Sequence, residues 1–408
     1  MTPPLAYRRM LLILGLATFV AMTGVGIIVP FLPIYARGLG ASGVMMGLIF
    51  SCFSLSRGMT VPLVGSLSDR WGRKPFIILG LAGYAVAAVL LVWTVTPGEL
   101  VLNRLFQGVF AAMVLPIAMA LVADVTPPGM EGRVFGGFNM FFLMGFGVGP
   151  LIGGAVYEYL GLQANFWLMA GLSLAALLAV ALFIKEPPPE QRSTGKRGLK
   201  EMMILVKDRP FAAVMVARFG AAAGMGCFIA FLPVIATDLG LNNLQVGACL
   251  TANVLVMTLL QRPFGRLADN TSRLALAVGG QLASGIMKVL IPYGGDFLWL
   301  MVLSMAEGVF AGLALPALTA MAISRGKALG QGMGLTTGAF TMALSVGVFL
   351  GPVSGGWAAD LSGDNNAALW LGGLAAIISA LVMWLMYATD KTPPLEPAEE
   401  LLPVERIP

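Results

Sequence analysis

Residues 24–47 read GVGIIVPFLPIYARGLGASGVMMG, and residues 224–247 read GMGCFIAFLPVIATDLGLNNLQVG. Glycines, leucines and the Phe-Leu-Pro triplet therefore recur in the second half of the chain, and the register continues in the segments 108–116 and 308–316. Both copies are strongly apolar. A membrane protein built from two similar halves is typical of a transporter whose binding site lies between the halves.

The composition of the whole chain agrees with membrane insertion, because 58% of the residues are hydrophobic and only 11% are charged. Apolar runs of about 20 residues, long enough to cross a bilayer as helices, recur from end to end. We predict an all-α integral membrane protein with twelve transmembrane helices in two parallel six-helix repeats, the first helix being retained rather than cleaved. The predicted spans are 10–33, 44–63, 76–95, 99–122, 134–157, 163–184, 211–233, 244–264, 274–293, 297–320, 332–355 and 367–389.

The spans divide the chain into two bundles with a linker and a tail. We predict an N-terminal six-helix bundle, a cytoplasmic linker, a C-terminal six-helix bundle and a disordered cytoplasmic tail, at residues 1–184, 185–209, 210–389 and 390–408. The linker contains three consecutive prolines and a basic run that suits the anionic inner leaflet. Within it, the segment 199–206 predicts a short interfacial helix.

The basic residues indicate the orientation. Most of the 25 Lys and Arg residues fall in segments on the side of the N-terminus, and Arg37 alone lies in a segment on the other side. The positive-inside rule therefore predicts that both termini are cytoplasmic. We expect a multi-pass protein of the bacterial inner (plasma) membrane, and the pI of 9.2 reflects its loops rather than a nucleic-acid partner.

Several kinds of chemistry are absent from the sequence. There is no histidine, which excludes His-based catalysis, His metal ligation and a His proton relay. The three cysteines, Cys52, Cys227 and Cys249, lack the spacing of metal ligands, and there is no phosphate-binding G-x-x-x-x-G-K-[ST] loop. We expect neither an enzyme nor a cofactor nor a metal site, so an ion gradient is the remaining energy source for active transport.

Residues 65–75, GSLSDRWGRKP, form a charged segment that we expect to be a tight loop between the second and third spans. It resembles the loop signature of the major facilitator superfamily, G-x-L-a-D-r-x-G-r-k, almost residue for residue. The resemblance implies the fold of that superfamily and a cytoplasmic gate that locks the outward-facing state through salt bridges. By resemblance, Asp69 and Arg73 form the lock and Asp124 is their partner. The gate residues are Gly65, Asp69, Arg70, Gly72, Arg73 and Asp124.

A second element, GFGVGPLIGG at residues 145–154, resembles the g-x-x-x-G-P-x-x-G-G element of the antiporter branch of this superfamily. The resemblance implies a drug–proton antiporter of the twelve-span efflux type. Spaced glycines allow close approach of another helix, and the proline introduces a kink. The residues expected at this packing are Gly145, Gly149, Pro150, Gly153 and Gly154.

Five charged residues lie well within the predicted spans: Arg57, Arg104, Arg218, Lys288 and Glu307. Charge inside a membrane is costly, so each is a candidate for function. Glu307 is the only acidic residue deep in a span. We predict that it carries the coupling proton together with Arg104, whose R-x-x-q-G element resembles one that the superfamily uses in coupling. A permanent ion pair of Glu307 with Arg104 or Lys288 is the structural alternative.

The substrate is a small molecule, and the substrate-binding candidates, chosen as polar, basic or aromatic residues of the spans, are Arg57, Arg218, Lys288, Gln107, Asn139, Asn253, Gln261, Phe31 and Phe231. We expect a monomer in contact with membrane lipids. Two functions remain open: proton-coupled antiport of small amphipathic molecules by alternating access, or export of an endogenous anionic or zwitterionic amphiphile (a siderophore, lipid or organic acid) through a basic cavity. A sensor without transport is the third class.

Overall fold

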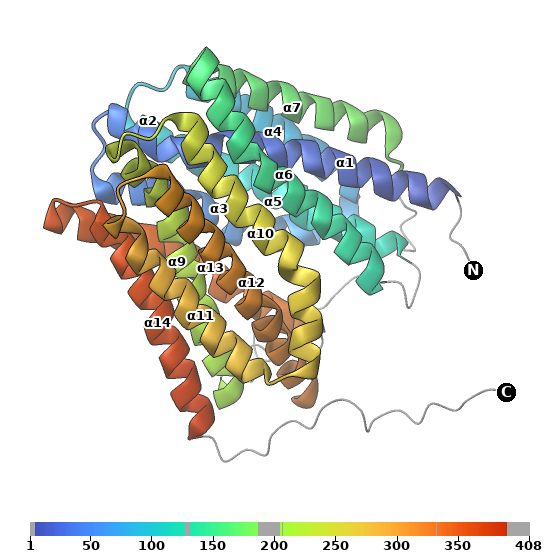
Figure 1. Cartoon of the computed structure of the whole chain (residues 1–408). Coiled ribbons are helices and arrows are strands. Elements are labelled where there is room, and N and C mark those ends of the chain that lie inside the picture. Colours follow the sequence, from blue (N-terminus) through green and yellow to red (C-terminus); the bar gives the residue numbers. More distant parts are fainter. Residues whose placement is uncertain (1–4, 127–130, 187–204, 206, 332, 390–408) are drawn as a thin grey trace.

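The computed structural model describes residues 5–126, 131–186, 205, 207–331 and 333–389. All regular structure in these residues is helical (Figure 1). The elements are α1 (Leu5–Ile28), η1 (Val29–Phe31), α2 (Leu32–Gly38), α3 (Gly43–Trp71), α4 (Arg73–Val92), α5 (Pro97–Val125), α6 (Glu131–Leu160), α7 (Leu162–Phe183), α9 (Arg209–Asp238), α10 (Asn243–Asn270), α11 (Arg273–Leu290), η3 (Ile291–Tyr293), α12 (Phe297–Ala328), α13 (Met333–Ser362) and α14 (Asn366–Ala388).

Twelve of these helical segments in the described residues are long and apolar enough to cross a membrane, which confirms the predicted all-α, twelve-span fold. The first span runs through α1, η1 and α2 without a break in direction large enough to end it, from Met10 to Gly38. Most helices are longer than the predicted spans, because polar and charged residues at their ends continue the helix beyond the apolar run. The predicted interfacial helix at 199–206 and the tail at 390–408 lie mainly or wholly outside the described residues.

The charged segment 65–75 is not the loop that the sequence predicted. α3 continues through Asp69 to Trp71, and α4 begins at Arg73, so a single residue separates the two helices. That residue is Gly72, whose φ of 107° is a conformation that side chains with a Cβ rarely adopt. Pro75 lies in the first turn of α4, where its missing N–H breaks no helical hydrogen bond.

The two halves of the chain lie side by side, and each helix packs mainly within its own half (Figure 1). Two helix pairs cross between the halves: α3 packs against α13, and α6 packs against α10. We call the end of the molecule with the 38–43 connection the loop-38 end, and the end with Gly72 the loop-72 end. The division at 184/185 and 209/210 stays a prediction, since residues 187–204 and 206 lie outside the described part.

The contacts between the halves repeat with the internal symmetry of the chain. At the loop-38 end, Gly356 of α13 lies against the backbone of Gly43 at the start of α3, and Gly154 of α6 lies against Asn243 at the start of α10. One turn further in, Gly47 meets the carbonyl of Pro352, and Gly247 meets that of Pro150. These four contacts, which we call the glycine seam, bring backbone against backbone, so there is no room for a Cβ at any of the glycines.

The seam generates a prediction about the conformation of the molecule. A leucine at Gly356 places a side chain against the Gly43 backbone, which has no flexible atoms to move aside, so α13 and α3 must separate. We expect Gly356→Leu to lengthen the distance between spin labels at Gly98 and Gly295, two exposed positions at the loop-38 end. The measurement is double electron–electron resonance in nanodiscs.

Gly171→Leu on α7 is the matched control, because nothing lies within 4 Å of a Cβ at that position. A distance distribution that Gly356→Leu leaves unchanged, while the variant remains folded, contradicts the role of the seam.

Candidate functional site

Glu307 lies at the centre of a buried polar cluster in the second half. Its Oε1 accepts hydrogen bonds from Lys288 Nζ, with which it forms an ion pair, and from Ser284 Oγ at 2.9 Å. Its Oε2 accepts from Asn253 Nδ2 at 2.6 Å. Glu307 and Lys288 are only 5% and 2% exposed. The carboxylate therefore has a partner at each oxygen, and we call these four residues the Glu307 cluster.

Three neighbouring helices supply the cluster. Asn253 comes from α10, Ser284 and Lys288 come from successive turns of α11, and Glu307 comes from α12. Two further helices, α9 and α14, lie against Lys288, and each has a glycine at the point of contact. A Cβ at Gly224 of α9 would lie 3.4 Å from Lys288 Cε, and one at Gly373 of α14 would lie 3.3 Å from Lys288 Cβ. The lysine is thus enclosed by five helices.

The corresponding place in the first half holds Arg104, which is 1% exposed. Its Nε donates to the Ile49 carbonyl at 3.2 Å, its Nη1 donates to Gln107, and its guanidinium lies 4.3 Å from the centre of the Phe53 ring. Gln107 occupies the position equivalent to Glu307, and its Nε2 contacts Met169 Sδ at 3.9 Å. The first half therefore places a cation and an amide where the second half places an ion pair.

Of the two partners that the sequence left open for Glu307, the structure selects Lys288. Arg104 belongs to a separate cluster in the other half, and no hydrogen bond or ion pair joins it to Glu307 in the described residues. The sequence left this choice open, because it does not show that Lys288, in the last turn of α11, lies beside Glu307, ten residues into α12.

The predicted gate residues meet at the loop-72 end. Arg73, 3% exposed, pairs with Asp69 of α3 and donates from Nε to Asp124 of α5 at 3.0 Å. Its Nη1 also donates to Ser68 Oγ at 2.8 Å. Glu186 accepts from the backbone N–H of Arg73 at 2.6 Å, so a carboxylate also meets the N-terminus of α4. We call these side chains the Arg73 cluster; every member lies in the first half.

The other gate residues have simpler positions. Gly65 lies on α3 with no atom within 4 Å of where a Cβ would be, and Arg70 is exposed. Gly72 provides the break between α3 and α4, and a Cβ there would meet the Glu186 carboxylate.

The glycine-rich element of α6 has two faces. Gly145, Gly149 and Gly153 approach the backbone of α1 at Phe19, Gly26 and Ile27, which packs α6 within the first half. Gly154 and the carbonyl group of Pro150 meet α10 and belong to the glycine seam, whereas the Pro150 ring lies against Gly26 of α1. The element predicted from sequence therefore packs two helix pairs at once.

Two carboxylates that the sequence analysis missed join the halves. Asp360 at the end of α13 accepts from the N–H groups of Gly43 and Val44 at 2.5 and 2.9 Å, and so caps the N-terminus of α3. Glu158 at the end of α6 accepts from the backbone N–H of Asn243 at 3.0 Å and caps α10. We call these the carboxylate caps. The repeat was the available signal, since both acids end the equivalent helix of their half.

The remaining hydrogen bonds and ion pairs between the halves, among the described residues, lie in the part of the molecule toward the same end. Arg37 of α2 pairs with Asp238 at the end of α9. Ser51 Oγ donates to the Phe349 carbonyl at 2.5 Å, and Leu151 N–H donates to Thr251 Oγ1 at 3.0 Å. In the described residues, the ion pairs of the loop-72 end join groups of one half, as Arg325 and Asp208 do. The two halves are therefore closed on each other at the loop-38 end.

The other substrate candidates have varied surroundings. Arg57, Arg218, Asn139 and Gln261 are half-buried, and Asn253 belongs to the Glu307 cluster. Arg57 lies within electrostatic reach of Tyr84, as Arg104 does. Phe31 and Phe231 are fully buried at the loop-38 end, where Phe31 packs edge-on against Tyr157, so neither is open to a ligand in this conformation. No group of three or more Cys, Asp or Glu in the described residues suits a metal ion.

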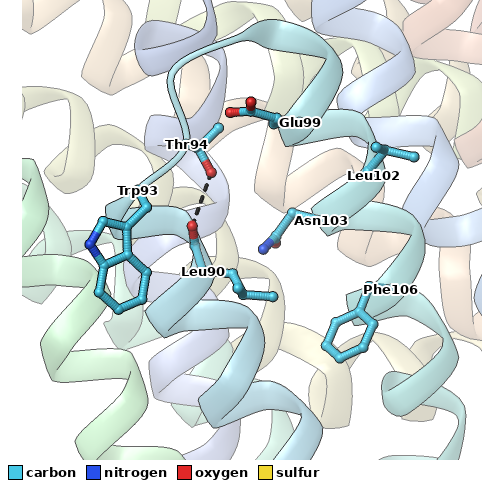
Figure 2. A pocket seen from close by; sticks show the side chains of 7 residues that line it. All are labelled: Leu90, Trp93, Thr94, Glu99, Leu102, Asn103 and Phe106. Carbon is cyan, nitrogen blue, oxygen red and sulfur yellow. Dashed lines mark hydrogen bonds between the residues drawn. The ribbon is translucent and has the colours of Figure 1, made fainter.

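A separate hollow of about 450 Å³ lies where α4 ends and α5 begins (Figure 2). Its walls are mainly apolar, and the Thr94 hydroxyl beside it donates to the Leu90 carbonyl at 3.2 Å. None of the predicted substrate-binding residues lines this hollow, so it is distinct from the candidate substrate site. The lining residues are Leu90, Trp93, Thr94, Glu99, Leu102, Asn103 and Phe106.

Comparison with known proteins gives a consistent result. The family model described as the Major Facilitator Superfamily matches residues 14–220 and 214–407. An uncharacterised MFS-type transporter of Methanocaldococcus jannaschii is 30% identical over 362 residues, which are 87% of this chain and 92% of that protein. The quinolone resistance protein NorA of Staphylococcus aureus is 23% identical over 378 residues, 92% of this chain and 96% of that protein. The crystal structure of a bacterial homologue of the human lysosomal transporter Spinster, inward-facing and unoccupied, has a TM-score of 0.77 at 14% identity, and the match covers 95% of this chain and 96% of that one.

The Arg73 cluster generates a prediction about stability. Arg73→Gln removes the guanidinium that pairs with Asp69 and Asp124, and the Asp124 side chain is only 1% exposed. Because breaking a buried ion pair costs about 3–5 kcal/mol, we expect a clear fall in the melting temperature of the purified protein.

Arg273→Gln is the matched control, because Arg273 is the repeat equivalent of Arg73 but pairs with Asp269 at 3.8 Å and is 36% exposed. An exposed pair contributes about 0–1 kcal/mol, so this variant should melt near the parent temperature. Equal melting temperatures for the two variants would show that the Arg73 cluster adds no stability.

Proposed function

The chain belongs to the major facilitator superfamily, and we propose that it exports small amphipathic molecules in exchange for protons by alternating access. It is a multi-pass membrane protein whose relatives include proteins named for quinolone and multidrug resistance. Those names favour drug efflux over the export of an endogenous anion. We further propose that it acts as a monomer in the bacterial inner membrane.

One observation carries the proposal: the contacts between the halves in the described residues gather at the loop-38 end. If the basic residues place the loop-72 end in the cytoplasm, the closed end faces outward and the conformation is inward-facing. An exporter in this conformation takes up its substrate from the cytoplasm or the inner leaflet. The glycine seam and the carboxylate caps then open when the halves rock into the outward-facing state.

The coupling step is assigned to Glu307. In the inward-facing state its carboxylate is paired with Lys288, which is the arrangement expected after a proton has left toward the cytoplasm. A proton arriving from outside neutralises the carboxylate and leaves the Lys288 charge buried without its counter-ion. The protonated and ionised cluster thus stabilise different states of the transporter, and the proton biases the exchange between them.

The substrate need not touch Glu307. It is sufficient that substrate and proton favour opposite conformations, because each shifts the same equilibrium by its differential affinity for the two states. In the outward-facing state the Arg73 cluster, in which Arg73 pairs with Asp69 and Asp124, also binds the second half as the loop-72 end closes. We thus propose that the Arg73 cluster stabilises the first half in the inward-facing state and joins the two halves in the outward-facing state.

The first functional prediction concerns Glu307→Gln. Glutamine retains an acceptor for Asn253 or Ser284 but cannot exchange a proton, so we expect uptake driven by a pH gradient to fall to background in proteoliposomes. Counterflow, which needs no net proton movement, should persist. The assay follows a panel of cationic, zwitterionic and anionic amphiphiles.

Because Glu307→Gln leaves Lys288 buried without a counter-ion, the double variant Glu307→Gln/Lys288→Met is made beside it. It should recover stability without recovering gradient-driven uptake. Gradient-driven uptake by either variant at the parent rate would remove Glu307 from the coupling mechanism.

The second functional prediction concerns the carboxylate caps. Removal of a helix N-cap costs about 1 kcal/mol, so Asp360→Ala or Glu158→Ala should shift the ratio of inward-facing to outward-facing molecules roughly five-fold toward the outward state. The shift is read from spin-label distances at the loop-38 end.

Asp296→Ala is the matched control, because Asp296 caps α12 at the same end but accepts from Trp299 N–H of its own half, at 2.7 Å. This variant should lose stability without changing the ratio. If Asp296→Ala shifts the ratio as much as Asp360→Ala does, the caps act on stability alone.

A further inference from the structure

Arg218 is the one intramembrane candidate whose charge is met by an aromatic ring alone in the described part of the chain. Its guanidinium lies 4.7 Å from the centre of the Phe340 ring of α13. Its Nε is fully buried and has no hydrogen-bond partner in the described residues. A guanidinium offers five N–H donors, and leaving donors unmet at a half-buried position is costly. The group therefore lacks an acceptor among the described residues, and a bound ligand can supply one.

The acidic residues near the membrane are already engaged elsewhere. Glu307 pairs with Lys288, Asp208 pairs with Arg325, and Asp238 pairs with Arg37. Asp360 and Glu158 form the carboxylate caps, and the Arg73 cluster holds the acids of the loop-72 end in the first half. No carboxylate of the described residues lies within ion-pair distance of Arg218. Among the described residues, therefore, the chain supplies no counter-charge to Arg218, which leaves its guanidinium able to pair with a bound anion.

Arg218 lies in the part of α9 nearer the loop-72 end. α9 begins at that end, and Arg218 lies nine residues from Arg209, or about 14 Å along the helix axis. Along α9, Arg218, Ala221, Met225 and Ile229 are less buried than most of their neighbours, and their spacing of three and four residues puts them on one face. α12, α13 and α14 also pack against α9, and α13 supplies the Phe340 ring beside Arg218.

The repeat indicates that this charge is not needed to build a bundle. The position equivalent to Arg218 in the first half is Thr18 of α1, whose hydroxyl donates to the Leu14 carbonyl within its own helix at 2.8 Å. A threonine whose hydroxyl is hydrogen-bonded within its own helix therefore occupies the equivalent position in the first-half bundle. The arginine in the second half is therefore an addition to the scaffold, which is expected of a residue that binds a ligand.

We propose that Arg218 and Phe340 bind the carboxylate of an aromatic amphipathic substrate in the space between the halves. A guanidinium stacked on a ring keeps its edge free, and its parallel N–H groups match the two oxygens of a carboxylate. The adjoining apolar face of α9, with Met225, accommodates the substrate's ring system. The inference rests on the proposed function and names the substrate class, aromatic acids and zwitterions, for which this site is selective.

The test uses pairs of ligands that differ only in the carboxylate. 1-Pyrenebutanoic acid and two further arylalkanoic acids are compared with their methyl esters, by fluorescence titration of the protein in dodecyl maltoside, which contains no phosphate. The loss of a charge-assisted pair predicts that Arg218→Gln raises the Kd of the acids about ten-fold or more. The Kd of the esters should stay within about two-fold of the parent value.

Two further variants make the test specific. Arg218→Lys keeps the positive charge but lacks the parallel N–H groups of the guanidinium, so it should bind the acids more tightly than Arg218→Gln but less tightly than the parent protein. Arg266→Gln removes an exposed arginine from α10, on the loop-72 side, and should change neither Kd. Equal effects of Arg218→Gln on acid and ester, no effect on either, or a parent protein that binds esters and cations but none of the acids would each overturn the proposal.

Binding without a gradient separates this inference from the proposed function. If the parent protein binds acids through Arg218 but no substrate accumulates under a pH gradient, the transport proposal fails and the carboxylate site stands. If cations accumulate in a Glu307-dependent manner and acids do not bind, the carboxylate site fails and the transport proposal stands. Competition by added phosphatidylglycerol that abolishes acid binding would make a lipid phosphate the occupant and would also overturn the assignment.

Discussion

The hydrocarbon core of a bilayer offers no hydrogen-bonding partner, and this constraint shapes the molecule at every level. Backbone groups must be satisfied within each segment, so the twelve spans are helices. Buried charges must find partners, so Arg73 pairs with Asp69 and Asp124, and Glu307 pairs with Lys288. Since helices in lipid gain little from apolar contact, close association comes from glycine, and the seam of backbone contacts between the halves follows. Arg218 differs from these charges, because its guanidinium faces the Phe340 ring and its buried Nε has no hydrogen-bond partner in the described residues.

The sequence predicted the features that follow from length and local composition, and missed those that depend on how helices meet. Apolar runs count the spans correctly because about 20 residues are needed whatever the packing. The family resemblance of the segment around Asp69 and Arg73 implied that these residues pair, and they form an ion pair in the structure. The loop expected there was wrong, because charged residues can continue a helix past the apolar run, and only Gly72 breaks it. The choice of Lys288 over Arg104 as the partner of Glu307, and the capping of α3 and α10 by Asp360 and Glu158, depend on contacts between distant segments that no single-residue pattern encodes.

The two halves of the internal repeat share their packing glycines but differ in their buried polar residues. The packing glycines are kept in both: Gly108 lies against the backbone of Phe53, and Gly308 lies against that of Asn253. The polar groups beside these glycines differ, with Arg104 and Gln107 in one half and Glu307 with Lys288 in the other. The two halves thus share the glycine contacts that pack each bundle, while the second half alone has a carboxylate at this position. In the proposed antiport, a titratable group in a single half lets one proton act on a conformational equilibrium that both halves share.

The strength of the contacts at the loop-38 end has to be moderate. Two states exchange usefully only when their free energies differ by a few kcal/mol, because a substrate or proton shifts the equilibrium by no more than its differential affinity. An apolar seam of large side chains would exceed that range, whereas glycine contacts bury little area. The polar links are also inexpensive to break: Arg37 and Asp238 are each more than 40% exposed, and the N–H groups capped by Asp360 and Glu158 can bind water instead. The ion pair of Glu307 is different, because it is buried and its loss costs several kcal/mol. A weak seam with a strong internal pair is the combination in which the state of one carboxylate can decide which side of the molecule is closed.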